Sequence, residues 1–130
     1  MDFLNKYAPQ LLGVLRIVTG LQFLEHGTSK MFHFPAAAGA AARAYDVMAW
    51  PVGPAGVIEV VGGVLITLGL FSRYAAFIAS GEMAIAYWTA HFPRGGFFPL
   101  LNGGDTAVCF CFIFLYLAAA GPGAFAVNQK

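Results

Sequence analysis

Residues 52–92 of this chain read VGPAGVIEVVGGVLITLGLFSRYAAFIASGEMAIAYWTAHF, and this stretch decides the fold. It contains two apolar segments, 52–71 and 74–92, which are joined by only Ser72 and Arg73. Each segment has roughly the 20 helical residues that the core of a bilayer requires. Because the connection is so short, the two predicted helices must run antiparallel and pack side by side.

Two further apolar segments, 8–31 and 104–120, flank this pair. The Gly-Pro-Gly sequence at 121–123 ends the last of them, because proline cannot continue a helix. The alanine-rich stretch 36–49 predicts a short helix lying on the membrane surface between the first two spans, with a plain loop as the alternative. The predicted fold is therefore all-α, an integral membrane four-helix bundle.

The composition independently favours lipid as the solvent. Of the 130 residues, 59% are hydrophobic and only 10% are charged, whereas about a quarter of the residues of a soluble domain are charged. The net charge of +1 excludes the basic surface typical of a nucleic-acid-binding protein. Cys109 and Cys111 would point to opposite sides of a helix, so they predict neither a disulfide nor a metal site. We expect a single domain over residues 1–130.

Ionisable side chains inside the predicted spans carry the information on function. Charges within a bilayer are rare unless they pair, line a wet cavity or act chemically. Helix direction and the 3.6-residue period place most of them in the half of the membrane opposite the termini. The residues expected to converge there on one open cavity are His26, Lys30, Glu59, His91 and Asp105. Tyr87 and Trp88 are expected to rim this cavity, and Phe97 or Phe98 to cover it.

Arg16 and Glu82 are also predicted to belong to the polar core, nearer the middle of the membrane. We expect Arg16 to pair with Glu59 or Glu82, because an unpaired buried charge costs several kcal/mol. Glu25 lies about 180° from Arg16 around the first helix and is expected to face away from the bundle axis. Such a core can lock the helix register, bind a ligand or act catalytically, and the residues leave all three readings open. The pattern assigns no catalytic residue and no metal ligand.

Several short motifs recur in an order that is distinctive over nearly the whole chain. They are LRIVTG at 15–20, HG at 26–27, KMF at 30–32, Glu59 followed by GG at 62–63, GLFSR at 69–73, AHF at 90–92 and GPG at 121–123. This order resembles the DoxX family of small bacterial membrane proteins. One position departs from the pattern: Asp105 stands where family members often have Glu, which keeps the charge but shortens its reach.

The resemblance implies a multi-pass protein of the bacterial inner (plasma) membrane, and Lys6 and Arg73 favour cytoplasmic termini. Relatives in that family include a subunit of a thiosulfate–quinone oxidoreductase and members tied to redox or thiol homeostasis. The resemblance thus implies an oxidoreductase-associated subunit that offers a polar pocket to a quinone-like or other small ligand. The chain encodes no cofactor-binding motif, so a quinone is the candidate cofactor, and catalysis by the chain alone stays open.

Two alternatives from other functional classes remain. One is a transporter or binding protein for small molecules without redox chemistry. The other is an assembly or scaffold subunit whose buried charges serve only helix packing. The expected partners are the lipid bilayer, a redox partner subunit and a second copy of this chain, whereas nucleic acid is not expected.

Overall fold

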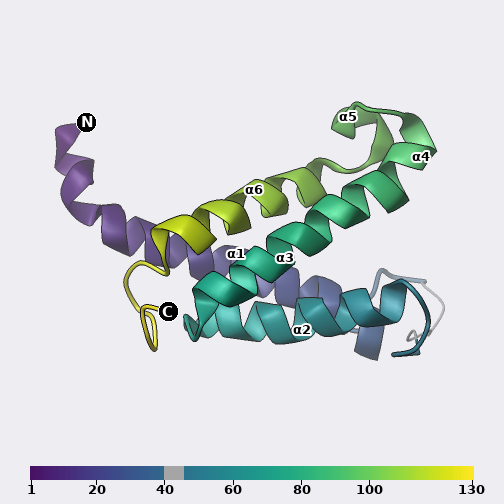
Figure 1. The fold of residues 1–130 in the computed structure, drawn as a ribbon, viewed down its shortest axis with the longest axis horizontal. Coiled ribbons are helices and arrows are strands. Elements are labelled where there is room, and N and C mark those ends of the chain that lie inside the picture. Colours follow the sequence, from purple (N-terminus) through teal and green to yellow (C-terminus); the bar gives the residue numbers. More distant parts are fainter. Residues whose placement is uncertain (40–45) are drawn as a thin grey trace.

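The computed structural model describes residues 1–39 and 46–130, and every regular element in these ranges is helical. The four long helices are α1 (Ala8–Phe32), α2 (Val52–Leu68), α3 (Ser72–Ala86) and α6 (Asp105–Ala120). The short elements are the 3₁₀ helix η1 (Asp2–Tyr7), the π-helical turn η2 (Tyr87–His91), α4 (Phe92–Gly95) and α5 (Pro99–Asn102). The all-α prediction is confirmed, and the long helices lie at the predicted segments (Figure 1).

The structure bears on two predictions about where helices lie and where they end. Residues 40–45 of the stretch 36–49, where a surface helix was expected, lie outside the described residues, and the described flanks are turn and coil. The third helix was predicted over 74–92, but the helical path continues from α3 through η2 and α4 to Gly95, past Pro93. None of the helices in the described ranges combines the length with the apolar composition needed to cross a membrane.

The turn between α2 and α3 forms as the short connection requires. Gly69 ends α2 with φ 67°, a left-handed conformation in which glycine carries no steric penalty. The Leu70 N–H then donates to the carbonyl oxygen of Leu65 at 2.9 Å, which satisfies one of the free carbonyls at the helix end. The chain therefore reverses immediately and starts α3 at Ser72.

The four long helices associate as two close pairs, α1 with α2 and α3 with α6, while α1 and α6 touch little. Glycines allow the first pair to approach closely: a Cβ added at Gly63 would lie 2.7 Å from the Cα of Leu24. Phe23 of α1 joins the two pairs, because its ring lies 4.9 Å from that of Phe114 and 5.8 Å from that of Phe110. Toward the ends of α1 and α2 that lie farthest from the chain termini, this aromatic contact gives way to a hollow.

Arg16 does not pair with a carboxylate, contrary to the prediction. Its guanidinium is fully buried and donates only to backbone carbonyl oxygens, those of Ile66, Thr67, Pro122, Ala124 and Phe125. The first two acceptors belong to the C-terminal end of α2, where the helix dipole favours a cation. The other three belong to the segment that follows α6. Arg16 therefore holds the end of the chain against α1 and α2.

Candidate functional site

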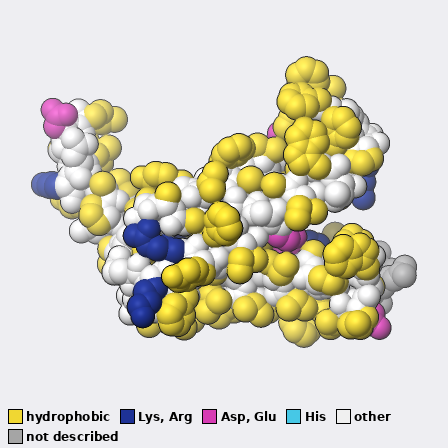
Figure 2. Space-filling view, in the orientation of Figure 1, with side chains coloured by type: hydrophobic (Ala, Val, Ile, Leu, Met, Phe, Trp, Pro, Cys, Tyr) yellow, Lys and Arg dark blue, Asp and Glu magenta, His cyan; other side chains and the backbone are white. Residues whose placement is uncertain are grey.

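A cavity of about 790 Å³ lies between the α1–α2 pair and the α3–α6 pair. Figure 2 shows its opening between the arm that carries α4 and α5 and the arm formed by α1 and α2, with acidic and basic side chains at its inner end. Most of the wall is apolar, and it includes Phe23, Ile58, Ile78, Ile85 and Phe110. An apolar wall with a few polar groups is the usual composition of a small-molecule site.

An ion pair lies at the inner end of the cavity. Lys30 Nζ of α1 lies 2.5 Å from Glu59 Oε1 of α2, and the side chain of Glu59 is only 1% exposed. Lys30 is 33% exposed, so its ammonium group connects the buried carboxylate to the more open part of the cavity. This pair is the only ion pair among the described residues.

Two carboxyl oxygens at the cavity have no hydrogen-bond partner in the described part of the chain. They are Oε2 of Glu59 and Oε2 of Glu82, and both atoms are buried. Both residues line the cavity, Glu59 from α2 and Glu82 from α3. Buried polar atoms are nearly always hydrogen-bonded, so an exception needs an explanation such as a bound group.

Further polar side chains lie around the cavity. The ring of His26 lies 5.7 Å from the ring of Phe110, in an edge-on contact. His91 Nδ1 lies 3.3 Å from the carbonyl oxygen of Asn102. Arg94, Thr89 and Thr106 also line the cavity and are exposed.

The π-helical turn η2 shapes one wall of the cavity. In it the Phe92 N–H donates to the carbonyl oxygen of Tyr87, five residues earlier, so the turn is wider than an α-helical one. Pro93 follows directly and has no N–H to donate to Thr89, which explains why the regular pattern fails here. The turn places Thr89 and His91 along the cavity. The turn η2 was not predicted, although Pro93 was the available signal in the sequence.

The structure brings five of the eight predicted polar-core residues to this cavity: His26, Lys30, Glu59, Glu82 and His91. Arg16, Tyr87 and Asp105 do not line it. Four further lining residues were not predicted from the sequence: Arg94, Thr89, Thr106 and Trp50. Thr89 lies in η2, Arg94 in α4, Thr106 in the first turn of α6 and Trp50 just before α2.

Asp105 was expected to converge on the cavity and does not. It is exposed at the first position of α6, where a carboxylate complements the helix dipole. Phe112 and Tyr116, which share its side of α6, are 64% and 59% exposed, so this side is the outer face of the helix. The inner face consists of apolar residues such as Phe110 and Phe114.

The aromatic residues expected to rim and cover the cavity also lie elsewhere. Tyr87 is buried, and its hydroxyl donates to the carbonyl oxygen of Phe97 and accepts from Asn102 Nδ2 at 3.2 Å. Tyr87 therefore holds the loop between α4 and α6. Trp88 and Phe98 pack against Phe97, with ring centroids 6.3 Å and 5.8 Å away, and none of the three lines the cavity.

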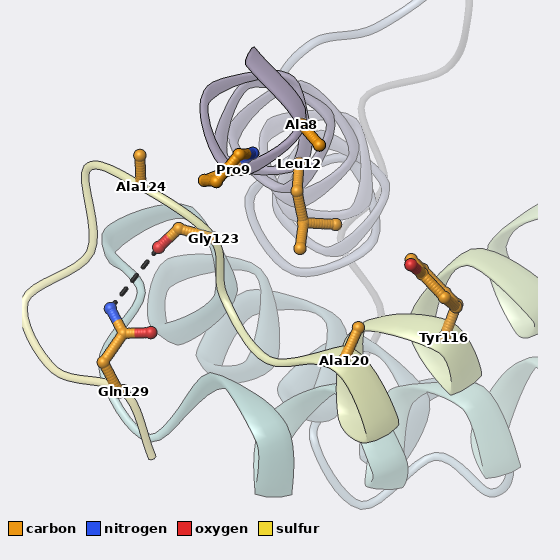
Figure 3. A pocket seen from close by; sticks show the side chains of 8 residues that line it. All are labelled: Ala8, Pro9, Leu12, Tyr116, Ala120, Gly123, Ala124 and Gln129. Atoms are coloured by element: carbon orange, nitrogen blue, oxygen red, sulfur yellow. Dashed lines mark hydrogen bonds between the residues drawn. The ribbon is translucent and has the colours of Figure 1, made fainter. Parts of the chain in front are cut away.

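A second hollow of about 580 Å³ lies near the start of α1. Figure 3 shows Ala8, Pro9 and Leu12 on one side, with Tyr116 and Ala120 across from them. The segment after α6 closes a further side, where Gln129 Nε2 donates to the carbonyl oxygen of Gly123 at 3.4 Å. No acidic or basic side chain lines this hollow, so it has none of the chemistry of the first cavity.

The fold and the cavity define a class of protein: a small helical bundle with an apolar cavity that ends in buried carboxyl groups. The DoxX family model matches residues 11–92, and the chain belongs to the DoxX family. An uncharacterized protein from Haemophilus influenzae is 45% identical over 133 residues, which cover 100% of this chain and 97% of that protein. No solved structure matches this chain.

Family membership supports a membrane location and a link to redox-related systems. The matched residues extend from α1 to the start of α4 and contain Lys30, Glu59 and Glu82. The charged inner end of the cavity is therefore built entirely from the part of the chain that the family model matches. α6 contributes the apolar wall opposite and lies beyond the match.

Proposed function

We propose that this protein is a membrane-embedded, non-catalytic subunit of a quinone-linked redox system, and that its cavity holds the head group of a quinone-like molecule. The observation that carries this proposal is the pair of unpartnered oxygens on Glu59 and Glu82, which are buried at the inner end of an apolar cavity. A ligand whose ring lies on the apolar wall can bring its polar substituents to these atoms. The volume of about 790 Å³ is in the range of small-molecule sites.

The proposed location in the bacterial inner membrane is supported by the family and by the molecular surface. Large apolar side chains are exposed along the helices, among them Leu11, Val18, Val61, Phe77 and Ile85. Figure 2 shows such side chains over much of the visible face. A soluble monomer rarely exposes apolar patches of this extent. Lipid is the proposed solvent for this surface.

The proposed orientation places both termini in the cytoplasm. The termini lie at one end of the bundle, and α4 and α5 lie at the other (Figure 1). Arg94 of α4 lines the cavity, so the cavity belongs to the end opposite the termini. A ligand would then be held in the outer half of the membrane. Electrons would come from a partner subunit, and a second copy of the chain is a further proposed partner.

Transport or binding of a small molecule without redox chemistry is the second candidate. It is favoured by the division of the bundle into two helix pairs, which meet mainly through α2 with α3 and through the ring of Phe23, and which have few contacts between α1 and α6. A pure scaffold role is less well supported, because the charged groups do not fill the space between the helices with mutual contacts.

The experiment is to purify the protein in mild detergent from a quinone-producing bacterium and to identify extracted small molecules by mass spectrometry. The test variant is Gly81→Leu, since Gly81 lines the cavity and a Cβ there would meet nothing within 4 Å. Ala119→Leu adds the same bulk at an exposed position outside both hollows and is the control.

We expect a quinone, recovered in its oxidised or reduced form, to co-purify with the wild type and with Ala119→Leu at near-equal amounts, and to be lost from Gly81→Leu. A different small molecule with the same loss would favour the non-redox binding role. Equal amounts of quinone in all three preparations would show that it is carried by the detergent micelle, and would contradict the proposal.

A further inference from the structure

The inner end of the cavity presents hydrogen-bond acceptors. Glu59 is 1% exposed, and its ion pair with Lys30 occupies Oε1 while Oε2 is left without a partner. An ionised carboxylate can only accept hydrogen bonds, so this oxygen requires a donor. Oε2 of Glu82 is the second unpartnered atom, and a carboxyl group keeps at least one acceptor oxygen in either protonation state.

The donors at the cavity are already engaged or exposed to solvent. Lys30 Nζ donates to Glu59 Oε1 at the inner end, and because Lys30 is one-third exposed, its remaining N–H groups can be satisfied by water. Arg94 and His26 are exposed, and His91 Nδ1 lies 3.3 Å from the carbonyl oxygen of Asn102. A ligand that reaches the inner end therefore meets unsatisfied acceptors there, whereas the donors of the protein already contact solvent, a backbone carbonyl or, for Lys30, the Glu59 carboxylate.

We propose that the cavity selects a head group that donates hydrogen bonds, and that it takes a hydroquinone in preference to the corresponding quinone. This inference rests on the proposed function, because it concerns the ligand of the same cavity. The hydroxyl groups of a hydroquinone can donate to the free oxygens of Glu59 and Glu82. A carbonyl oxygen of a quinone that faced the ion-paired Glu59 carboxylate would bring lone pairs to both sides, and this buried acceptor would stay unsatisfied.

An ammonium group is the other chemical source of such donors. It satisfies the same acceptors, and it adds an attraction to the carboxylates together with a repulsion from Lys30. The shared chemistry is donation of hydrogen bonds, so the test must include an amine beside the two quinone forms.

The first experiment measures anaerobic binding of three probes to the detergent-solubilised protein by titration calorimetry. The probes are a decyl-substituted benzohydroquinone, its quinone and decylammonium, which share one alkyl tail. The same titrations on Gly81→Leu measure partition of the probes into detergent. We expect the hydroquinone to bind at least about tenfold more tightly than the quinone, in line with one hydrogen bond to a charged group.

The outcomes separate this inference from the proposed function. Equal binding of the two forms, or tighter binding of the quinone, would overturn the donor inference and leave the quinone site in place. Binding of decylammonium alone would support donor selection and overturn the choice of a hydroquinone, together with the redox role. No binding beyond that of Gly81→Leu for any probe would overturn both proposals.

Glu82→Gln tests the residue directly. The amide adds donors where the wild type has a carboxyl group, so we expect the preference for the hydroquinone to fall by about tenfold, through weaker hydroquinone and stronger quinone binding. Glu25→Gln is the matched control, because Glu25 is exposed and does not line the cavity. An unchanged preference in Glu82→Gln with a native helical circular dichroism spectrum would contradict the role of Glu82, and the wild-type comparison decides the inference if the variant does not fold.

Discussion

The Nε of Arg16 donates a hydrogen bond of 2.9 Å to the carbonyl oxygen of Pro122, which lies 106 residues further along the chain. The remaining guanidinium donors reach carbonyls of Ile66, Thr67, Ala124 and Phe125. One side chain thus closes the end of the bundle that carries both termini. Its charge is stabilised by oriented peptide dipoles and the end of α2 rather than by an acidic partner.

Replacing Arg16 by leucine is expected to lower the free energy of unfolding by about 3 kcal/mol, because buried carbonyl oxygens lose their donors. Arg16→Lys should recover only part of this loss, since an ammonium has fewer donors than the guanidinium fork. Thermal unfolding in detergent measures both. Arg94→Leu is the control at an exposed arginine, and an equal drop in its melting temperature would refute the structural role of Arg16.

The ion pair between Lys30 and Glu59 predicts that the effect of substituting one residue on stability depends strongly on whether the other is present. Lys30→Met leaves a carboxylate that is 1% exposed without its cation and should cost about 3 kcal/mol or more. The double variant Lys30→Met with Glu59→Gln should be more stable than Lys30→Met alone, because the uncompensated charge is gone. A double-mutant cycle on unfolding midpoints measures the coupling, and simple additivity of the two single effects would count against it. Lys6→Met serves as the exposed control.

Two glycines in neighbouring helices predict opposite effects of the same substitution. Gly63→Ala should destabilise the protein by about 1–3 kcal/mol, since the new Cβ would lie 2.7 Å from backbone atoms of Leu24 and push α1 from α2. Gly81→Ala should be neutral or stabilising by up to about 1 kcal/mol, because its Cβ meets nothing within 4 Å and alanine favours the helix. Denaturant or thermal unfolding in one detergent compares them. The packing account fails if Gly63→Ala is as stable as Gly81→Ala.

The hydroxyl of Tyr87 is expected to hold the loop between α4 and α6. Tyr87→Phe removes its bonds with Phe97 and Asn102 and should cost about 1 kcal/mol, while Asn102 keeps its 2.8 Å bond to the carbonyl oxygen of Gly96. Hydrogen exchange of the loop amides should become faster. Tyr74→Phe, at a side chain that is 68% exposed, is the control. Unchanged loop protection in Tyr87→Phe would rule out this role for the hydroxyl.

Which residues line the cavity could be predicted in part from helix geometry. Lys30 and Glu59 are charged residues at matching depth on adjacent antiparallel helices, so their meeting follows from local periodicity and helix direction. Asp105 satisfied the same depth argument, but its side chain does not face the cavity, because Phe110, Phe114 and Leu117 on another side of α6 pack inward. The depth of a residue in the bundle depends only on its position along its helix. The direction in which its side chain points depends on which side of that helix packs against the core.

What the sequence by itself determined was the helical class, the positions of the long helices and the family, because apolar runs, proline and glycine breakers and ordered short motifs are local properties of the chain. Only the tertiary structure decided the carbonyl partners of Arg16, the π-helical turn before Pro93 and the separation of the bundle into two pairs with a cavity between them. These features depend on which distant segments pack together. The path of the residues after α6, for example, supplies three of the acceptors of Arg16, and no local pattern encodes that path.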